Sequence, residues 1–474
     1  PEVSGIWSQT FLDDTVGILL AGVYQERHSG QAGATNQSWE DKDGSAIPKN
    51  GLQTNAPGDG DLVAVPQEVV YTLDEWERER INGQFTLQWR PIDSVTATLD
   101  YTYAELELDH RYNNMSLWFS KTGQSATWTD GPVVSPLIYT EFDDQPDFPM
   151  GAGVDASRNE RDSLGFNLIW DVNDRLSLEV DYHDSTAKRE PNSRWGSSAT
   201  IAIASFGRQS ASADFTKEIP YVATVASDPL SPDDMRITGS LFENQWAEMD
   251  IEQTQFKGSF EFNDRTVIDF GVSQTDLDNF ESSSIVQRNT WGQNQASAYG
   301  SVADLVVPAS LKGVYDELSG GSRVRNNFFL FDMVDVVNRA ELLQNLPEGD
   351  SWYLPTAVTD GDCGTGLCPD SNPGFGNQLS EETIAYFIEV TYMGEMFNMP
   401  FNLRAGYRYE ETDVTASAES QNYTRIDWAS TNEFTAVPSE DLIPSALEDD
   451  YDVGLPMIDF DIDVTDNIKL RASY

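Results

Sequence analysis

Six carboxylate side chains recur at alternating positions of strand-like segments, and two of them could work together as an acid and a base. These residues are Asp100, Glu179, Asp181, Asp269, Glu389 and Asp461. Glycoside hydrolysis uses a pair of carboxylates, and Glu179 and Asp181 could supply one. The same alternation recurs in segment after segment, as expected for the polar wall of a lumen. We therefore interpret these residues as lumen-lining and expect no enzymatic activity.

Neither the histidines nor the cysteines have the spacing of a reactive centre. His28, His110 and His183 are far from one another and from both cysteines, whereas a metal site or an activated nucleophile needs such groups together. Cys363 and Cys368 flank four residues, and in an exported protein we expect them to form a disulfide. Zinc would need two further ligands, so we predict no metal and no cofactor.

The elements that must position the carboxylates are β-hairpins, and residues 83–103 show the pattern most clearly. Phe85, Leu87 and Trp89 alternate with polar residues, Pro91 ends the run, and a second alternating run follows the turn. We expect the apolar side chains to face lipid and the polar ones to face a wet lumen. For one hairpin alone, a soluble β-sandwich explains the alternation equally well.

The rest of the chain favours a barrel over a sandwich, because the hairpin recurs with long segments between its copies. The six hairpins, which give twelve strands, cover residues 5–24, 83–103, 164–183, 254–273, 384–409 and 455–474. The long connections, which we expect to be without regular structure, are residues 28–80, 109–161, 187–250, 278–382 and 415–454. Short turns at one end and long loops at the other are typical of outer-membrane barrels. Within the longest connection, residues 326–346 are expected to form a short helix over the mouth.

Composition excludes several classes of protein. The 474 residues include 79 acids and 29 bases, for a net charge of -50, so a nucleic-acid partner is not expected. Mean hydropathy is -0.44 and no stretch approaches 18 apolar residues, which excludes a membrane helix. Residues 426–468 contain no Lys or Arg, and we expect a solvated acidic loop there.

Basic residues on the predicted lumen face should pair with the acids across strands. Arg404 and Arg408 are expected to project inward near Glu389 or Glu410. In the last hairpin, the register predicts that Asp463 lies beside Lys469 and Asp461 beside Arg471. These lumen-lining residues could hold the wall and contact a plug, or they could line the substrate path.

Eight tryptophans outside the predicted strands are the candidate ligand-binding residues. They are Trp39, Trp118, Trp128, Trp195, Trp246, Trp291, Trp352 and Trp428. Trp76 also lies outside those strands. Aromatic faces suit sugar rings, although each of these residues could instead pack one loop against another. An acidic and aromatic mouth fits a neutral oligosaccharide better than an anionic ferric siderophore.

The last hairpin carries a family resemblance. Residues 455–474, LPMIDFDIDVTDNIKLRASY, are similar to the LP-S-hydrophobic-N strand, short turn and L-R-x-S-x strand found late in TonB-dependent outer-membrane receptors. Met457 and Asp459 depart from the commoner Ser and Asn. Residues 8–27, 83–103 and 382–412 resemble other barrel hairpins of this family, in its large-loop, carbohydrate-uptake branch.

The resemblance implies a 22-stranded barrel around an N-terminal plug, driven through TonB and its inner-membrane energising complex. Residues 1–474 then correspond to part of the barrel, about 12 strands that form an open antiparallel sheet, without the plug. The implied function is import of a scarce nutrient, most simply an oligosaccharide, across the outer membrane of a Gram-negative bacterium. A ferric-siderophore receptor, a passive porin and a surface glycan-binding protein or glycosidase are the alternatives.

Overall fold

The fold is all-β, as predicted. A computed structural model describes residues 1–120, 123–142, 147–226, 229–289, 301–324, 327–344, 361–371, 375–430, 433–465 and 467–474. Strands make up most of these residues. No helix in the described part of the chain is both long and apolar enough to cross a membrane.

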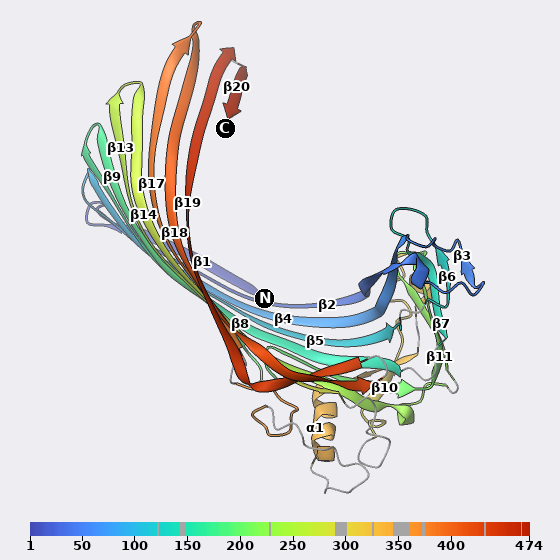
Figure 1. The fold of residues 1–474 in the computed structure, drawn as a ribbon. Helices are drawn as coiled ribbons and strands as arrows, with labels where there is room; N and C mark the ends of the chain where they lie inside the picture. Colours follow the sequence, from blue (N-terminus) through green and yellow to red (C-terminus); the bar gives the residue numbers. More distant parts are fainter. Residues whose placement is uncertain are drawn as a thin grey trace.

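The main element is an antiparallel sheet of 13 strands, strongly curved, whose path of pairings runs from β1 to β20 (Figure 1). Its strands are β1 (Glu2–Phe11), β2 (Val16–Asp43), β4 (Leu62–Ile92), β5 (Val95–Trp118), β8 (Asp147–Asn173), β9 (Leu176–Pro191), β10 (Ser198–Phe206), β13 (Arg236–Asn263), β14 (Thr266–Asn289), β17 (Phe375–Met396), β18 (Met399–Ser430), β19 (Glu433–Thr465) and β20 (Ile468–Ser473). Both β9 and β10 pair with β8 and with β13: β9 pairs with the halves of these strands near the turns, and β10 pairs with their other halves. Among the described residues, β1 and β20 do not pair with each other.

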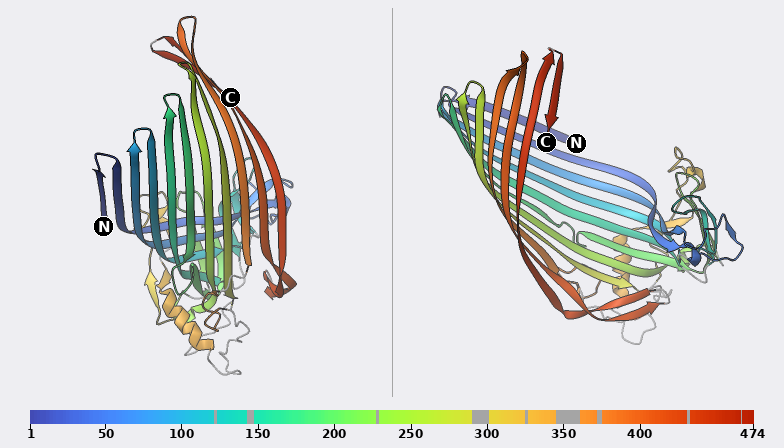
Figure 2. Two further views of the ribbon diagram at one scale, coloured as in Figure 1. Left: turned by 90° about the vertical axis from the view of Figure 1, so that its left-hand side faces the viewer. Right: turned by 45° about the horizontal axis from the view of Figure 1, so that its top comes forward.

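All six predicted hairpins are present. They are β1–β2, β4–β5, β8–β9, β13–β14, β17–β18 and β19–β20. Their short turns lie together at one end of the sheet (Figure 2). Phe397 and Asn398, with φ of 55° and 61°, make a two-residue turn of the kind whose twist suits a tight hairpin.

The prediction of five connections without regular structure is wrong, because the strands continue far past the predicted hairpins. β4 has 31 residues and β19 has 33. The predicted acidic loop is therefore a strand: residues 433–465 form β19, and its described acids, such as Glu448 and Asp450, are exposed on it. Apolar alternation marks only the half of each strand near the turn, which is why sequence reasoning ended the strands early.

Smaller elements cover the end of the sheet that lies away from the turns. They are a five-stranded sheet of β3 (Gln53–Thr54), β6 (Ser125–Trp128), β7 (Pro136–Phe142), β11 (Arg208–Asp214) and β12 (Tyr221–Ala226), a pair formed by β15 (Val306–Ala309) and β16 (Phe328–Phe331), and helix α1 (Met333–Gln344). The Phe329 amide donates to Met150 Sδ and the Phe331 amide to Asn113 Oδ1. The helix predicted within residues 326–346 thus exists, but it packs on the convex side of the sheet and not over a mouth (Figure 1).

The two faces of the sheet differ near the turns as the alternation predicts. Because successive side chains of a strand point to opposite faces, the pairing registers assign a face to every residue. The convex face carries an apolar band with residues such as Trp89, Leu99 and Tyr407, and many of them are exposed: Trp89 is 53% accessible, Tyr386 54% and Ile388 53%. The nine residues predicted to line a lumen all share the concave face. They are Asp100, Glu179, Asp181, Asp269, Glu389, Arg404, Arg408, Asp461 and Arg471.

Charged side chains on the concave face near the turns are joined in pairs. Arg404 Nε lies 3.0 Å from Glu389 Oε1, and Arg408 contacts Glu410. In the last hairpin the predicted register is confirmed, with Asp463 opposite Lys469 and Asp461 opposite Arg471. The side-chain contacts do not follow the register alone, since Lys469 Nζ lies 2.9 Å from Asp461 and 3.4 Å from Asp463.

Beyond the apolar band, the polarity of the convex face reverses, and the same strands carry a continuous belt of acids. The acidic belt consists of Glu26, Glu77, Glu79, Glu105, Glu107, Glu160, Asp162, Asp184, Asp250, Glu252, Asp276, Asp278, Glu382, Glu411, Asp413, Asp450 and Asp452. Within it, Arg158 Nη2 lies 2.6 Å from both Glu105 and Glu160. All the acids of this belt lie on the convex face. The net charge of the whole chain therefore does not give the charge of the concave face.

Gly271 provides a test of the register between β13, β14 and β17. A Cβ atom there would lie 2.5 Å from the Phe387 ring and 2.6 Å from the Phe256 carbonyl oxygen, whereas a Cβ at Gly83 would meet nothing within 4 Å. We expect Gly271→Val to lower the free energy of unfolding by about 1–3 kcal/mol through overpacking, with Gly83→Val as the control. Urea unfolding of the folded protein in detergent measures the difference. Equal stability of the two variants would show that the register is wrong.

Candidate binding groove on the concave face

A groove of about 940 Å³ lies on the sheet just beyond the level at which the convex apolar band ends. The concave side chains that line it come from seven neighbouring strands, β2, β4, β5, β8, β9, β13 and β14. The groove arginines, by which we mean Arg27, Arg78, Arg80, Arg161 and Arg189, all face it. Its floor is apolar and consists of Ala104, Leu106, Leu108, Ala187 and Met249.

The registers arrange these side chains in rows that run across the strands. Arg80 lies opposite Leu106, which lies opposite Asn159, which lies opposite Arg189. In the adjacent row, Arg27 and Arg78 lie directly opposite each other on β2 and β4. Two like charges in this position repel, so the arrangement costs stability in the absence of an anion.

The groove arginines differ from several bases of the concave face in having no acidic partner. Nearer the turns, Lys257, Arg404 and Lys469 each contact a carboxylate. In the part of the chain that the structure describes, none of the groove arginines has a carboxylate within 4.0 Å, and the nearby acids Glu105, Glu160 and Glu248 project to the convex face. The groove is therefore a patch of positive charge in a strongly acidic protein.

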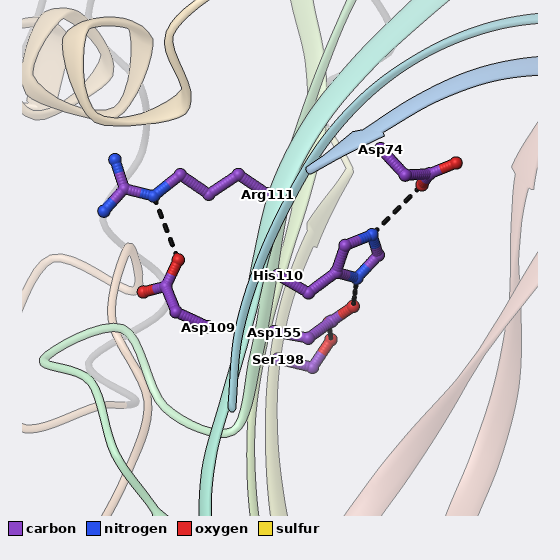
Figure 3. Close-up of polar contacts among 6 residues, drawn as sticks. All are labelled: Asp74, Asp109, His110, Arg111, Asp155 and Ser198. Atoms are coloured by element: carbon purple, nitrogen blue, oxygen red, sulfur yellow. Dashed lines mark hydrogen bonds and ion pairs between the residues drawn. The ribbon is translucent and has the colours of Figure 1, made fainter. Parts of the chain in front are cut away.

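A cluster around His110 adjoins the groove one step further along β5. His110 Nε2 lies 3.0 Å from Asp74 Oδ1, His110 Nδ1 lies 2.9 Å from Asp155 Oδ2, and the Ser198 hydroxyl donates to Asp155 at 2.7 Å (Figure 3). Trp76 stacks on the imidazole, with ring centroids 4.7 Å apart. Arg111, the next residue along, projects to the opposite face and pairs with Asp109 (Figure 3).

This geometry makes the cluster a clamp between strands and not a catalytic centre. Both imidazole nitrogens face carboxylates, so the ring keeps no free nitrogen to act as a base, and Ser198 bonds to Asp155 and not to His110. Burial lowers the pKa of His110, but the hydrogen bonds to Asp155 and Asp74 outweigh it, and the pKa lies above its ordinary value. The hydrogen bonds of His110 and Asp155 thus tie β4, β5, β8 and β10 together.

The predicted tryptophans do not form one binding surface. Trp128 and Trp195 are buried, at 2% and 7% accessibility, and Trp128 Nε1 donates to Gln53. Trp39 and Trp118 are exposed, while Trp246 lies on the convex face of β13. Trp428 lies in β18, and Trp291 and Trp352 lie outside the described residues. Trp76, which is not among the eight candidates, adjoins the groove through its contact with His110.

The disulfide between Cys363 and Cys368 is present in the structure. Among the described residues, no group of three or more His, Cys, Asp or Glu side chains could hold a metal ion. Glu179 and Asp181, the candidate carboxylate pair, both accept a hydrogen bond from Asn167 Nδ2 at 2.9 Å. Their geometry is that of a polar wall in which an amide bridges neighbouring acids.

No protein-family model matches the chain, and a search of curated proteins finds no match. The site is therefore interpreted from its own geometry.

Sequence reasoning missed both the groove and the His110 cluster, because most of the residues that form them lie in segments predicted to be loops or just past the ends of the predicted strands. Arg78 and Arg80 could have been found by continuing the alternation of β4 past Gly83, since they stay in phase with Gln84. No signal in the sequence joins His110 to Asp155, which depends on the register between β5 and β8.

We expect Asp155→Asn to lower the pKa of His110, because it removes one of the two carboxylates that favour the imidazolium. Titration of the histidine ring protons by NMR measures it, with His110→Gln to assign the signal and His183→Gln as the control. An unchanged pKa would contradict the contact.

The same cluster predicts how stability depends on pH. The folded state holds the His110 proton more tightly than the unfolded chain, so the stabilisation is fully present below about pH 6.5 and is lost as the pH rises through the raised pKa. Unfolding of the wild type and of His110→Gln should therefore differ most at acidic pH. A difference that grows with increasing pH would contradict this account.

Proposed function

We propose that the protein is an outer-membrane active-transport receptor of the TonB-dependent type, which captures a scarce nutrient outside a Gram-negative cell and imports it. The residues described above would form about 12 strands of a 22-stranded barrel. The ligand is most simply an oligosaccharide, and catalysis has no part in the function.

The observation that carries this proposal is the continuous, exposed apolar band on the convex face. On β5 it extends over residues 95–103, about 30 Å along the strand and roughly 23 Å in height if the strand is tilted by about 40°. That height matches the apolar layer around an outer-membrane barrel. Soluble proteins rarely expose an apolar surface that continues across so many strands.

Further support comes from what borders the band. Tyr24, Tyr103, Tyr182 and Tyr409 end it on four strands, and the acidic belt follows directly. Aromatic residues prefer the membrane interface, while carboxylates belong in water. Short turns on one side and the smaller sheets and α1 on the other fit periplasmic and extracellular ends.

The concave face suits a transporter more than a wide passive pore. In this proposal the paired charges near the turns stabilise the barrel wall and contact a plug. The groove binds the ligand when TonB displaces that plug. Uncompensated charge beside an apolar floor suits a site that contacts both the charged groups and the carbon skeleton of a ligand. The grooved wall therefore favours a receptor that binds its ligand.

The test is growth of a strain that lacks the gene, on a panel of oligosaccharides and ferric chelates as limiting nutrients. We expect the strain to lose growth on one class of oligosaccharide, and to lose it equally when TonB is deleted. The full-length protein should fractionate with the outer membrane. Loss of growth on ferric chelates alone would favour a siderophore receptor, and uptake that does not depend on TonB would favour a porin.

A further inference from the structure

The concave groove has an electrostatic character opposite to that of the whole protein. The formal net charge is -50, yet five arginines gather on one patch of one face. Among the concave side chains that line the groove, Glu281 is the acidic one. A ligand that enters the groove meets positive charge at close range, whatever the protein's total charge.

We propose that the groove binds an oligosaccharide whose sugar residues carry carboxylates, and that the groove arginines hold those carboxylates. This inference rests on the proposed function and makes its substrate class more specific. It also revises the expectation of a neutral ligand, which followed from the net charge and the tryptophans and not from the residues that face inward.

Arginine is the side chain best suited to this task. Its planar guanidinium donates two parallel hydrogen bonds to one carboxylate, and such charge-assisted pairs are stronger than neutral hydrogen bonds. A carboxylate between Arg27 and Arg78 would also remove the repulsion between these two opposed cations. The opposed arginines therefore favour an anion between them.

The spacing of the arginines indicates a ligand with more than one negative group. Arg80 and Arg189 lie in the same row, three strand spacings apart, or about 14 Å. A single small anion cannot contact both ends of the row. An oligomer with a carboxylate on successive residues can contact them together.

The remaining lining residues fit the sugar part of such a ligand. Leu106, Leu108 and Met249 offer an apolar floor for the C–H faces of the rings. Asn82 and Asn159 offer amides to the hydroxyl groups. A neutral oligosaccharide would use the floor and the amides but would leave the arginines uncompensated.

The experiment measures binding to the full-length receptor in detergent by calorimetry. The probes are a tetramer of galacturonic acid, the same tetramer with its carboxylates methyl-esterified, and a neutral tetramer of galactose. We expect the acidic tetramer to bind at least tenfold more tightly than the other two. Only its affinity should fall as salt is raised, because salt screens the charge.

The variants Arg78→Gln and Arg161→Gln should each weaken binding of the acidic tetramer by about tenfold or more. Arg78→Lys keeps the charge but not the paired donors, and it should restore part of the affinity. Arg111→Gln is the matched control, because Arg111 lies on β5 but projects to the convex face, and it should leave the affinity unchanged. A cooperative urea transition at or above the wild-type midpoint verifies that each variant is folded, since Arg78→Gln also removes the repulsion between Arg27 and Arg78.

Each contrary result is distinguishable. Equal binding of acidic and neutral tetramers, unaffected by the arginine variants, would overturn the inference and leave the oligosaccharide receptor standing. Tighter binding of the acidic tetramer that the arginine variants leave unchanged would overturn it too, because the arginines would then not hold the carboxylates. If no tetramer binds and only ferric chelates are imported, the proposed function fails with it.

Discussion

The pleat of the sheet is the constraint on which the rest of the structure depends. Each residue of a strand must point to the face opposite its neighbour's, and the registers of β4, β5 and β8 run without a break over most of their length. The face of every side chain is therefore fixed from the turn to the far end. A slip of one residue would exchange the apolar band with the polar wall.

Within that constraint, the long strands exchange their apolar and polar faces part-way along their length. On β5, the side chains of Leu99 and Tyr101 face the convex side near the turn, and Glu105 and Glu107 face the same side further on. The concave side changes in the opposite sense, from Thr98 and Asp100 to Leu106 and Leu108. Such a reversal separates the acids from the groove arginines across the thickness of one sheet. This is how a protein of net charge -50 presents a basic inner patch.

The part of the fold that could be predicted is the part where one face is apolar. There, alternation identified all six hairpins and the register of the last one, because apolar and polar side chains differ sharply. Past Tyr103 the polarity of the two faces reverses, since Glu105 and Glu107 now share the face of Tyr103 while Leu106 and Leu108 lie on the other. Following one apolar face along the sequence therefore ended the predicted strands too early. Contacts such as His110 with Asp155 join strands 45 residues apart and depend on tertiary register.

The most direct test of the central claim, that the convex band faces lipid and the concave face faces water, compares two neighbouring residues of β4. A nitroxide would be attached to Leu87→Cys or to Gln88→Cys in the full-length protein in lipid bilayers, and its relaxation measured with oxygen, which enters lipid, and with a water-soluble nickel chelate. We predict that oxygen affects the label at position 87 more strongly and that the nickel chelate affects the label at 88 more strongly. Equal access of the chelate to both positions would contradict the account.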